Sequence, residues 1–426
     1  MNALLPRYVN YPKLNVLPAD GVEYGSVTIN PDAKPWRDRA YVGIDPVKFK
    51  GFYPNELEED SGEEAGQFVY TASGDGKADK MNVLTYQTYD FGRTLTGFFK
   101  LNVKAEAGTT LYILFDEIIT DRGMYKEVSP FRNGCCNVIK YTMPAGGHEL
   151  ITFEANATRF ATVVVTDGEA DIADFGMVLY ENPDAASFKY DYGDAELNKI
   201  VSAAVNTFAQ NAVDVLTDCP SRERAGWLCD SYFSSRAEAL FTGKNLVEKS
   251  FLENYTMCPQ SKYLPEGMLP MCYPADHNDG VYIPNWTMWY ILELRNYWKR
   301  TGDEAMCAAS KDKVYGLVKF FEKYYNEYGL LENLESWVFI EWSKCNDGDY
   351  IKGLNYPSNA IVGNYLRLEL LLRYGYKTNV LQECRDFFSK MADLTGTLWE
   401  HSSLGASLNY GFASMAAVYI DECAKK

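Results

Sequence analysis

Apolar and polar residues alternate along the chain from about residue 66 to residue 182, as they do in strands that turn one face to a hydrophobic core. The clearest series on one face is Leu95, Gly97, Phe99, Leu101 and Val103. Glycine-containing turns separate such runs, for example at 74–76, 108 and 146–147. This pattern predicts an antiparallel β-sandwich over residues 66–185, preceded by an irregular segment over residues 1–65.

After residue 185 the apolar positions take the three- and four-residue spacing of amphipathic helices. The first series follows Asp191 or Asp194, either of which is a suitable N-cap, and starts at Leu197. Further helical stretches are expected at 231–243, 246–257, 285–300, 304–327, 358–374, 378–393 and 405–423. About eight helices joined by long polar loops predict an (α/α) helical-hairpin toroid over residues 186–426.

The composition is typical of a soluble globular protein, with 47% hydrophobic and 23% charged residues in 426. Because no run of about 18 apolar residues is present, we expect no transmembrane helix and no membrane partner. The first residues also lack the basic and apolar segments of a secretory signal, which leaves the compartment open. The net charge of −17 would repel phosphate backbones and argues against nucleic acid as a partner. No pattern indicates an oligomeric state.

Cysteine and histidine residues are too scattered to suggest a metal site. None of the ten cysteines forms a CxxC pair, and the three histidines form no HExxH or His-x-His pair. We therefore expect no transition-metal site. Aromatic residues make up 15% of the chain; their faces can stack on sugars, although most aromatic residues in any protein are core residues.

The stretch DCPSRERAGWLCD, from Asp218 to Asp230, carries the strongest chemical signal. Its proline and glycine disfavour a continuous helix and predict a bent loop in which Asp218, Glu223 and Asp230 converge. Glycoside hydrolysis needs such groups, because one carboxylic acid protonates the leaving oxygen and a second carboxylate activates water or attacks the sugar. A loop whose acidic residues and arginines form only salt bridges is the alternative.

Three later loops also combine acidic residues with tryptophan. Their candidate residues are Asp276, Trp286, Glu341, Trp342, Trp399, Glu400 and His401. Loops at one end of a toroid would bring these side chains to a single cleft. Taken one at a time, they are also explained as carboxylates at helix ends, core tryptophans and a structural histidine.

Two of these motifs together resemble the bacterial α-L-rhamnosidases of glycoside hydrolase family 78 and their six-hairpin relatives. The resemblance rests on DCPSRERAGW followed by Asp230, and on GTLWEH followed by Ser-Leu-Asn. The likeness is clear over residues 160–426 and looser over the preceding sandwich. It implies an inverting hydrolase that needs no cofactor and acts on a rhamnose-containing glycan or glycoside.

The resemblance also implies roles for individual residues. Glu223 matches the general acid and Glu400 the general base that activates water. Asp218 and Asp230 match residues that hold the sugar hydroxyls, and Trp227 matches an aromatic residue of the pocket. The carboxyl groups of an inverting pair are expected about 6.5 to 9.5 Å apart, which leaves room for a water molecule. The remaining substrate-binding candidates are Arg222, Asp276, Trp286, Glu341, Trp342 and His401.

The chain departs from this family in two ways. Six hairpins require twelve helices, whereas the pattern predicts about eight, and residues 355–364 join segments that are normally far apart. We therefore predict a toroid that lacks two hairpins and leaves apolar helix faces exposed. Tyr410 also stands where relatives usually carry histidine. The alternatives are a catalytically impaired glycan-binding protein on the same fold, and a polysaccharide lyase, for which the acid-rich motif is poorly suited.

Overall fold

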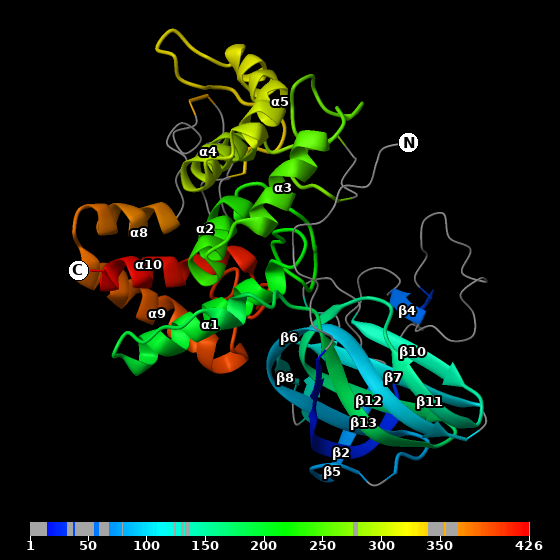
Figure 1. Ribbon diagram of the computed structural model, residues 1–426. Coiled ribbons are helices and arrows are strands. Elements are labelled where there is room, and N and C mark those ends of the chain that lie inside the picture. The colour runs from blue at the N-terminus through cyan, green and yellow to red at the C-terminus, as the bar shows by residue number, and fades with distance from the viewer. Residues whose placement is uncertain are drawn as a thin grey trace.

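A computed structural model of the protein describes residues 15–31, 37–38, 55–58, 68–78, 80–106, 108–122, 125–128, 132, 137–275, 280–339, 353–354 and 364–425. Strands occupy the first part of the chain and helices the second, and Figure 1 shows the two parts beside each other. Among the described residues, no helix is both long and apolar enough to cross a membrane.

The first part is a β-sandwich built around one long strand, β6 (Thr85–Ala105). Its beginning pairs with β2 (Asp20–Ile29) and β12 (Asn156–Asp167), and its end pairs with β11 (Gly146–Ile151) and β13 (Ala170–Leu179). Gly92 between these halves has a φ of 79°, which suits glycine and allows the strand to bend. The other strands are β1 (Val16–Pro18), β3 (Arg37–Asp38), β4 (Asn55–Glu58), β5 (Phe68–Asp75), β7 (Thr109–Asp116), β8 (Ile119–Arg122), β9 (Tyr125–Val128) and β10 (Val138–Met143).

Aromatic contacts join the two layers of the sandwich. Tyr89, in the first half of β6, stacks on Phe175 of β13 with ring centroids 4.3 Å apart. Phe99, in the second half, meets Phe115 of β7 at 5.1 Å. The apolar face predicted from Leu95 to Val103 lies in this core, so the sandwich prediction is confirmed.

The prediction that residues 1–65 are irregular is wrong for residues 16–29. Strand β1 pairs with β13, and β2 pairs with both β5 and β6. Glycines interrupt the alternation of β2, which hid the strand in the sequence. Gly25 is needed there because a side chain would collide with Thr71 and Tyr86 of the neighbouring strands.

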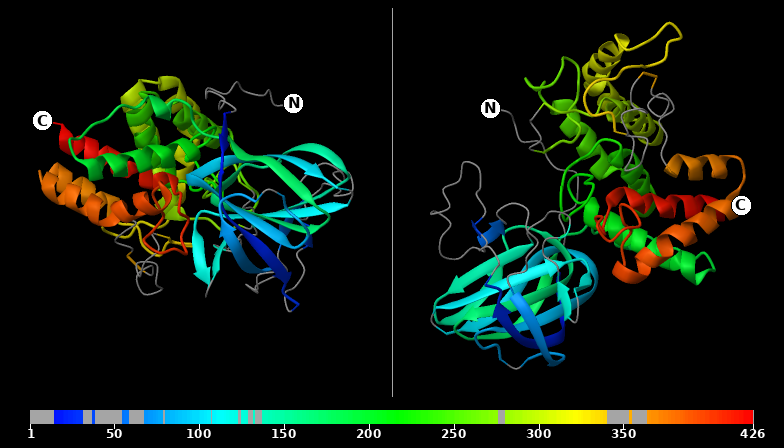
Figure 2. Two further views of the ribbon diagram at one scale, coloured as in Figure 1. Left: turned by 90° about the horizontal axis from the view of Figure 1, so that it is seen from below. Right: turned by 180° about the vertical axis from the view of Figure 1, so that it is seen from behind.

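The second part contains eight α-helices among the described residues, in agreement with the predicted number. They are α1 (Ala195–Asn211), α2 (Asp230–Thr242), α3 (Leu246–Met257), α4 (Pro284–Thr301), α5 (Glu304–Glu322), α8 (Asn364–Arg373), α9 (Lys377–Thr395) and α10 (Met415–Ala424), with 3-10 turns η3 (Ala185–Ser187) and η5 (Gly411–Ser414). Helices α1, α9 and α10 pack against one another, as the green, orange and red helices of Figure 2 show. Asp194 caps α1 by accepting from the amides of Glu196 and Leu197.

The last helix begins later than predicted. The pattern placed a helix at 405–423, but α10 begins at Met415 and residues 405–410 form a loop. Ser407 pairs with Glu400 across this loop through two hydrogen bonds. Local polar pairing thus replaces the helical hydrogen bonds at these positions.

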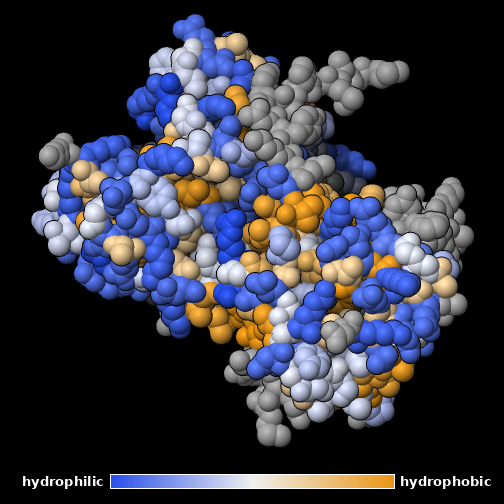
Figure 3. All heavy atoms as spheres, turned by 60° about the horizontal axis from the view of Figure 1, so that its bottom comes forward, coloured by the Kyte–Doolittle hydropathy of each residue, from blue (hydrophilic) through white to orange (hydrophobic). Residues whose placement is uncertain are grey.

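Polar side chains on α1 hold the helical part to the sandwich. Gln210 accepts from the hydroxyl of Thr96 and donates to the carbonyl of Thr94. Asn206 donates to the same carbonyl and to that of Gly396. On the face drawn in Figure 3, hydrophobic residues gather between the two parts while hydrophilic residues cover most of each. Helix α1 therefore carries the loops at its C-terminal end in a fixed position over the sandwich.

Candidate active site

The loop between α1 and α2 carries the first acidic motif and is bent, as predicted. Two hydrogen bonds between Asp218 and Ala225 close the bend. The amide of Asp218 donates to the carbonyl of Ala225, and the amide of Ala225 donates to the carboxylate of Asp218 at 3.1 Å. Arg224 and Cys229 have φ values of 54° and 76°, which are uncommon for residues with side chains. The bend leaves Asp218 and Asp230 buried, while Glu223 and Arg224 stay exposed.

Helix α1 joins this loop to the second motif. The side chain of Asn211, its last residue, donates to the side chain of Asn409, and its carbonyl accepts from the amide of Thr217. The amide of Gly411 donates to the carbonyl of Asp218 at 2.6 Å. A side chain at Gly411 would lie 2.6 Å from the carbonyl oxygen of Thr217, so glycine allows the two loops to approach.

Arg222 bridges the two predicted catalytic carboxylates. Its Nη2 lies 2.6 Å from Oε1 of Glu223 and 3.5 Å from Oε2 of Glu400. Because both oxygens contact one nitrogen, they are no farther apart than these two distances together, about 6 Å. Glu223 is 29% exposed and Glu400 is 7% exposed, so solvent reaches the first more easily than the second. Two carboxylates from loops far apart in sequence therefore meet at one guanidinium group.

The carboxylate of Glu400 is held by its own loop. Its Oε2 accepts from the backbone amide of Ser407 at 3.2 Å, and its backbone amide donates to the carbonyl of Ser407. The preceding residues are anchored in the core, since Trp399 is 2% exposed and its indole donates to the hydroxyl of Thr395. The position of this carboxylate thus depends on the backbone around Ser407.

Two further carboxylates, those of Asp218 and Asp230, are buried and close enough to Glu223 to interact with its charge. Asp218 is fully buried, and burial together with the negative charge of Glu223 raises its pKa to about 7. Burial and the charge of Asp218 raise the pKa of Asp230 well above its usual value, although a hydrogen bond from Tyr410 opposes the shift. Acidic groups with such shifts commonly mark functional sites.

Tyr410 belongs to the same cluster, although sequence reasoning treated it only as a departure from the family. Its hydroxyl hydrogen-bonds to the carboxylate of Asp230. Burial and the surrounding carboxylates raise the pKa of its hydroxyl well above the ordinary value. Tyr410 is therefore a hydrogen-bond donor at this site and stays protonated at neutral pH.

Asp218→Asn is expected to make stability depend less on pH. The pKa of Asp218 is about 7 in the folded protein, against about 3.9 in an unfolded chain. The folded state binds this proton more tightly than the unfolded chain does. The contribution of this proton to the free energy of unfolding is therefore at its maximum below about pH 4 and is lost as the pH rises to about 7. The fall in Tm between pH 5 and pH 8 should be smaller in the variant than in the wild type. Asp393→Asn, at a 59% exposed carboxylate, is the control; equal falls in all three proteins would contradict the prediction.

Trp227 and Trp286 lie in the hydrophobic core of the helical part. They are 6% and 8% exposed and meet edge to face at 5.6 Å. Trp286 also packs on Phe339 at 5.4 Å. Most of their surface therefore contacts protein, and sugar stacking on either stays a prediction.

Of the remaining predicted residues, the structure describes only His401. Asp276, Glu341 and Trp342 lie outside the described residues. The ring of His401 accepts from the amide of Ser403, which places it in the partly exposed turn after Glu400. Within the part of the chain that the structure describes, no group of three or more His, Cys, Asp or Glu residues is arranged to hold a metal ion.

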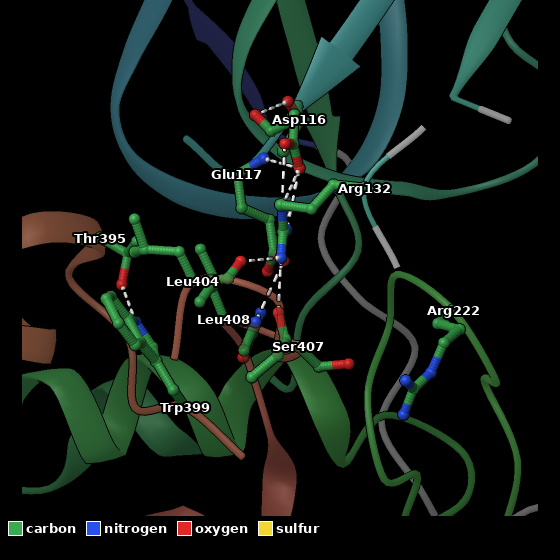
Figure 4. Close-up of polar contacts among 12 residues, drawn as sticks. Asp116, Glu117, Arg132, Arg222, Thr395, Trp399, Leu404, Ser407 and Leu408 are labelled. Atoms are coloured by element: carbon green, nitrogen blue, oxygen red, sulfur yellow. Dashed lines mark hydrogen bonds and ion pairs between the residues drawn. The ribbon is translucent and has the colours of Figure 1, made fainter. Parts of the chain in front are cut away.

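Sequence reasoning missed a cluster of three charged residues of the sandwich, in which Glu117 and Arg132 contact the loop of Glu400 and Asp116 binds Arg132. Figure 4 shows the three residues beside Leu404, Ser407 and Leu408. The one signal in the sequence was the pair of acidic residues directly after the apolar run of β7.

Comparison with known proteins agrees with the motifs. The family described as bacterial α-L-rhamnosidase six-hairpin glycosidase domain matches residues 184–363. An α-L-rhamnosidase of Formosa agariphila is 27% identical over 152 residues, and one of Streptomyces avermitilis is 22% identical over 264 residues. The resemblance to the bacterial α-L-rhamnosidases is confirmed. These matches cover 34% and 61% of this chain but only 16% and 24% of the two rhamnosidases, so the chain corresponds to part of each.

Solved rhamnosidase structures share the fold. A rhamnosidase from Klebsiella oxytoca with rhamnose bound has a TM-score of 0.65 at 13% identity, covering 95% of this chain and 96% of that one. A family 78 rhamnosidase of Bacillus sp. GL1 has a TM-score of 0.57 at 19% identity, covering 80% of this chain and 31% of that one. The arrangement of a sandwich followed by a rhamnosidase-type helical domain is therefore common to all three.

Proposed function

We propose that this chain is an inverting glycoside hydrolase that removes terminal α-L-rhamnosyl residues from glycans or glycosides. The observation that carries the proposal is the meeting of Glu223 and Glu400 at Arg222. Glycoside hydrolysis needs two carboxyl groups on opposite sides of the scissile bond. The rhamnosidases that resemble the chain support the choice of sugar.

In the proposed reaction Glu223 is the general acid and Glu400 is the general base. Glu223 gives a proton to the glycosidic oxygen while Glu400 takes one from water. The water oxygen bonds to the anomeric carbon as the bond to the leaving group breaks, so the configuration inverts. The more exposed Glu223 suits protonation of a leaving group that extends into solvent, and the more buried Glu400 suits a single enclosed water molecule.

Arg222 has to move aside when substrate binds. The two oxygens that it contacts lie within about 6 Å of each other, which is less than the separation of about 6.5 to 9.5 Å between the carboxyl groups of inverting enzymes. The sugar and a water molecule need the space that the guanidinium group fills. Because the side chain of Arg222 is 28% exposed, it has room to turn outward and to contact the substrate.

Asp218, Asp230 and Tyr410 form the floor of the proposed sugar site. A group of buried carboxylic acids with raised pKa values offers both hydrogen-bond donors and acceptors to hydroxyl groups. The raised pKa of Tyr410 also argues against a polysaccharide lyase, in which a tyrosine base would have to lose its proton readily.

The experiment that tests the proposal is a screen of aryl glycosides with the purified chain. Release of the aryl group from the α-L-rhamnoside, with β-L-rhamnose as the first product seen by NMR, is expected. First formation of the α-anomer would contradict inversion, and an unsaturated product absorbing in the ultraviolet would indicate a lyase. Calorimetric binding of rhamnose without turnover would instead identify a glycan-binding protein that has lost its activity.

A further inference from the structure

A cluster of three charged residues lies between the sandwich and the loop of Glu400. The Nε of Arg132 donates to both carboxylate oxygens of Asp116, at 2.9 and 2.8 Å, and its Nη2 donates to Glu117 at 2.5 Å. The side chain of Arg132 is 9% exposed, and those of the two acids are each 1% exposed. A buried ion pair of this kind is strongly disfavoured when one partner is lost, because the other charge is left uncompensated.

The same cluster binds the backbone of the loop that follows Glu400. Arg132 donates from Nη1 to the carbonyls of Leu404 and Ala406, at 3.3 and 2.5 Å. Glu117 accepts from the amide of Leu408 at 3.1 Å. Figure 4 shows the guanidinium group of Arg132 between the two acids and this loop. The sandwich thus fixes backbone groups on both sides of Ser407.

Ser407 is the residue that holds the carboxylate of Glu400. Its amide donates to Oε2, the oxygen that also faces Arg222. The amide group of Ser407 is formed with the carbonyl carbon of Ala406, whose oxygen Arg132 binds. A shift in the position of that peptide group would therefore move the donor that orients Glu400.

We propose that Arg132 and Glu117 are positioning residues for Glu400, which makes the sandwich part of the catalytic unit. This inference rests on the proposed function for its effect on rate, but its effect on the loop is independent of that function. The charges of Asp116 and Glu117 hold Arg132 in place, and Arg132 holds the peptide groups that orient Glu400. Misplacing a catalytic group by about 1 Å can cost about 100-fold in rate, so such support is functionally significant.

The chain offers a matched control for testing this role. Arg159 is another arginine of the sandwich that binds both oxygens of an aspartate, Asp90, and donates to a backbone carbonyl of the helical part, that of Leu394. Its acceptor lies in the last turn of α9 rather than in the loop of Glu400. Arg132→Lys and Arg159→Lys each keep the positive charge but lose the planar group that binds several acceptors at once.

Arg132→Lys is expected to lower kcat for an aryl α-L-rhamnoside at least tenfold, with little change in KM, whereas Arg159→Lys keeps the wild-type kcat. Azide should restore part of the activity of Arg132→Lys, because it attacks the anomeric carbon without needing a base. The new C–N bond forms as the C–O bond breaks, and Glu223 protonates the leaving oxygen. Equal kcat values in the two variants, or no response to azide, would overturn the proposal.

Hydrogen exchange separates this inference from the proposed function. In Arg132→Lys the backbone amides of Ser407 and Leu408 should exchange faster than in the wild type and in Arg159→Lys. If the wild-type chain hydrolyses no glycoside, the proposed function fails, and this measurement alone decides whether the cluster holds the loop. Unchanged exchange at both amides would overturn the inference even in an active enzyme.

Discussion

Glu223→Gln is expected to lower kcat/KM for an unactivated rhamnoside, such as a disaccharide, by about 100- to 10,000-fold, the usual range for loss of a general acid. The amide has the size of the carboxyl group and can still accept from Arg222, so the loop should keep its shape. It cannot give a proton to the glycosidic oxygen. Steady-state rates with the disaccharide and with a dinitrophenyl rhamnoside measure the effect. The loss should be much smaller with the second substrate, whose leaving group needs no proton.

Glu154→Gln is the matched control for this substitution. Glu154 pairs with Arg224, the residue after Glu223, at 2.9 Å and is equally exposed at 29%. Removing its charge changes the electrostatics of the same loop without touching the proposed acid. If both variants lost the same activity, or if the loss in Glu223→Gln were the same with both leaving groups, Glu223 would not be the acid.

The sequence supplied the main elements because their patterns are local. Alternation from Leu95 to Val103 is visible in nine residues, and the capping of α1 by Asp194 involves residues two and three positions away. The strand β2 was missed because its glycines serve contacts with strands far along the chain. The predicted helix at 405–410 failed for a related reason, since Ser407 is bound by Glu400 across the loop rather than by its helical neighbours.

The candidate site was predictable only where its functional residues stand close together in the sequence. Asp218, Glu223 and Asp230 stand within thirteen residues and could be read together, whereas the partnership of Asp230 with Tyr410 depends on the fold. The bridge through Arg222 is also a tertiary contact, which makes this residue the link between the motifs in addition to a substrate-binding candidate. Nothing near Arg132 in the sequence points to a loop more than 270 residues later.

The second large effect is expected from Glu400→Gln, which should lower kcat by about 100- to 10,000-fold for activated and unactivated rhamnosides alike. Water must be deprotonated whatever the leaving group is, so a better leaving group does not replace the base. The glutamine oxygen can still accept from the amide of Ser407, which keeps the loop in place. Rates with the same two substrates as for Glu223→Gln measure the loss.

Azide distinguishes the lost base from a damaged fold. It needs no deprotonation, so it should restore turnover of Glu400→Gln and give a rhamnosyl azide of inverted configuration, whereas Glu223→Gln should gain little because its acid is missing. Glu335→Gln, at a 66% exposed carboxylate, should behave like the wild type. A product azide of retained configuration would contradict this role, because two successive inversions require a covalent intermediate on another residue, and Glu400 would then be the acid/base group of a double-displacement reaction. Retention by the wild type together with an inverted azide from Glu400→Gln would identify Glu400 as a nucleophile. Inversion in the variant, combined with inversion in the wild type, leaves general-base catalysis by Glu400 as the mechanism consistent with both.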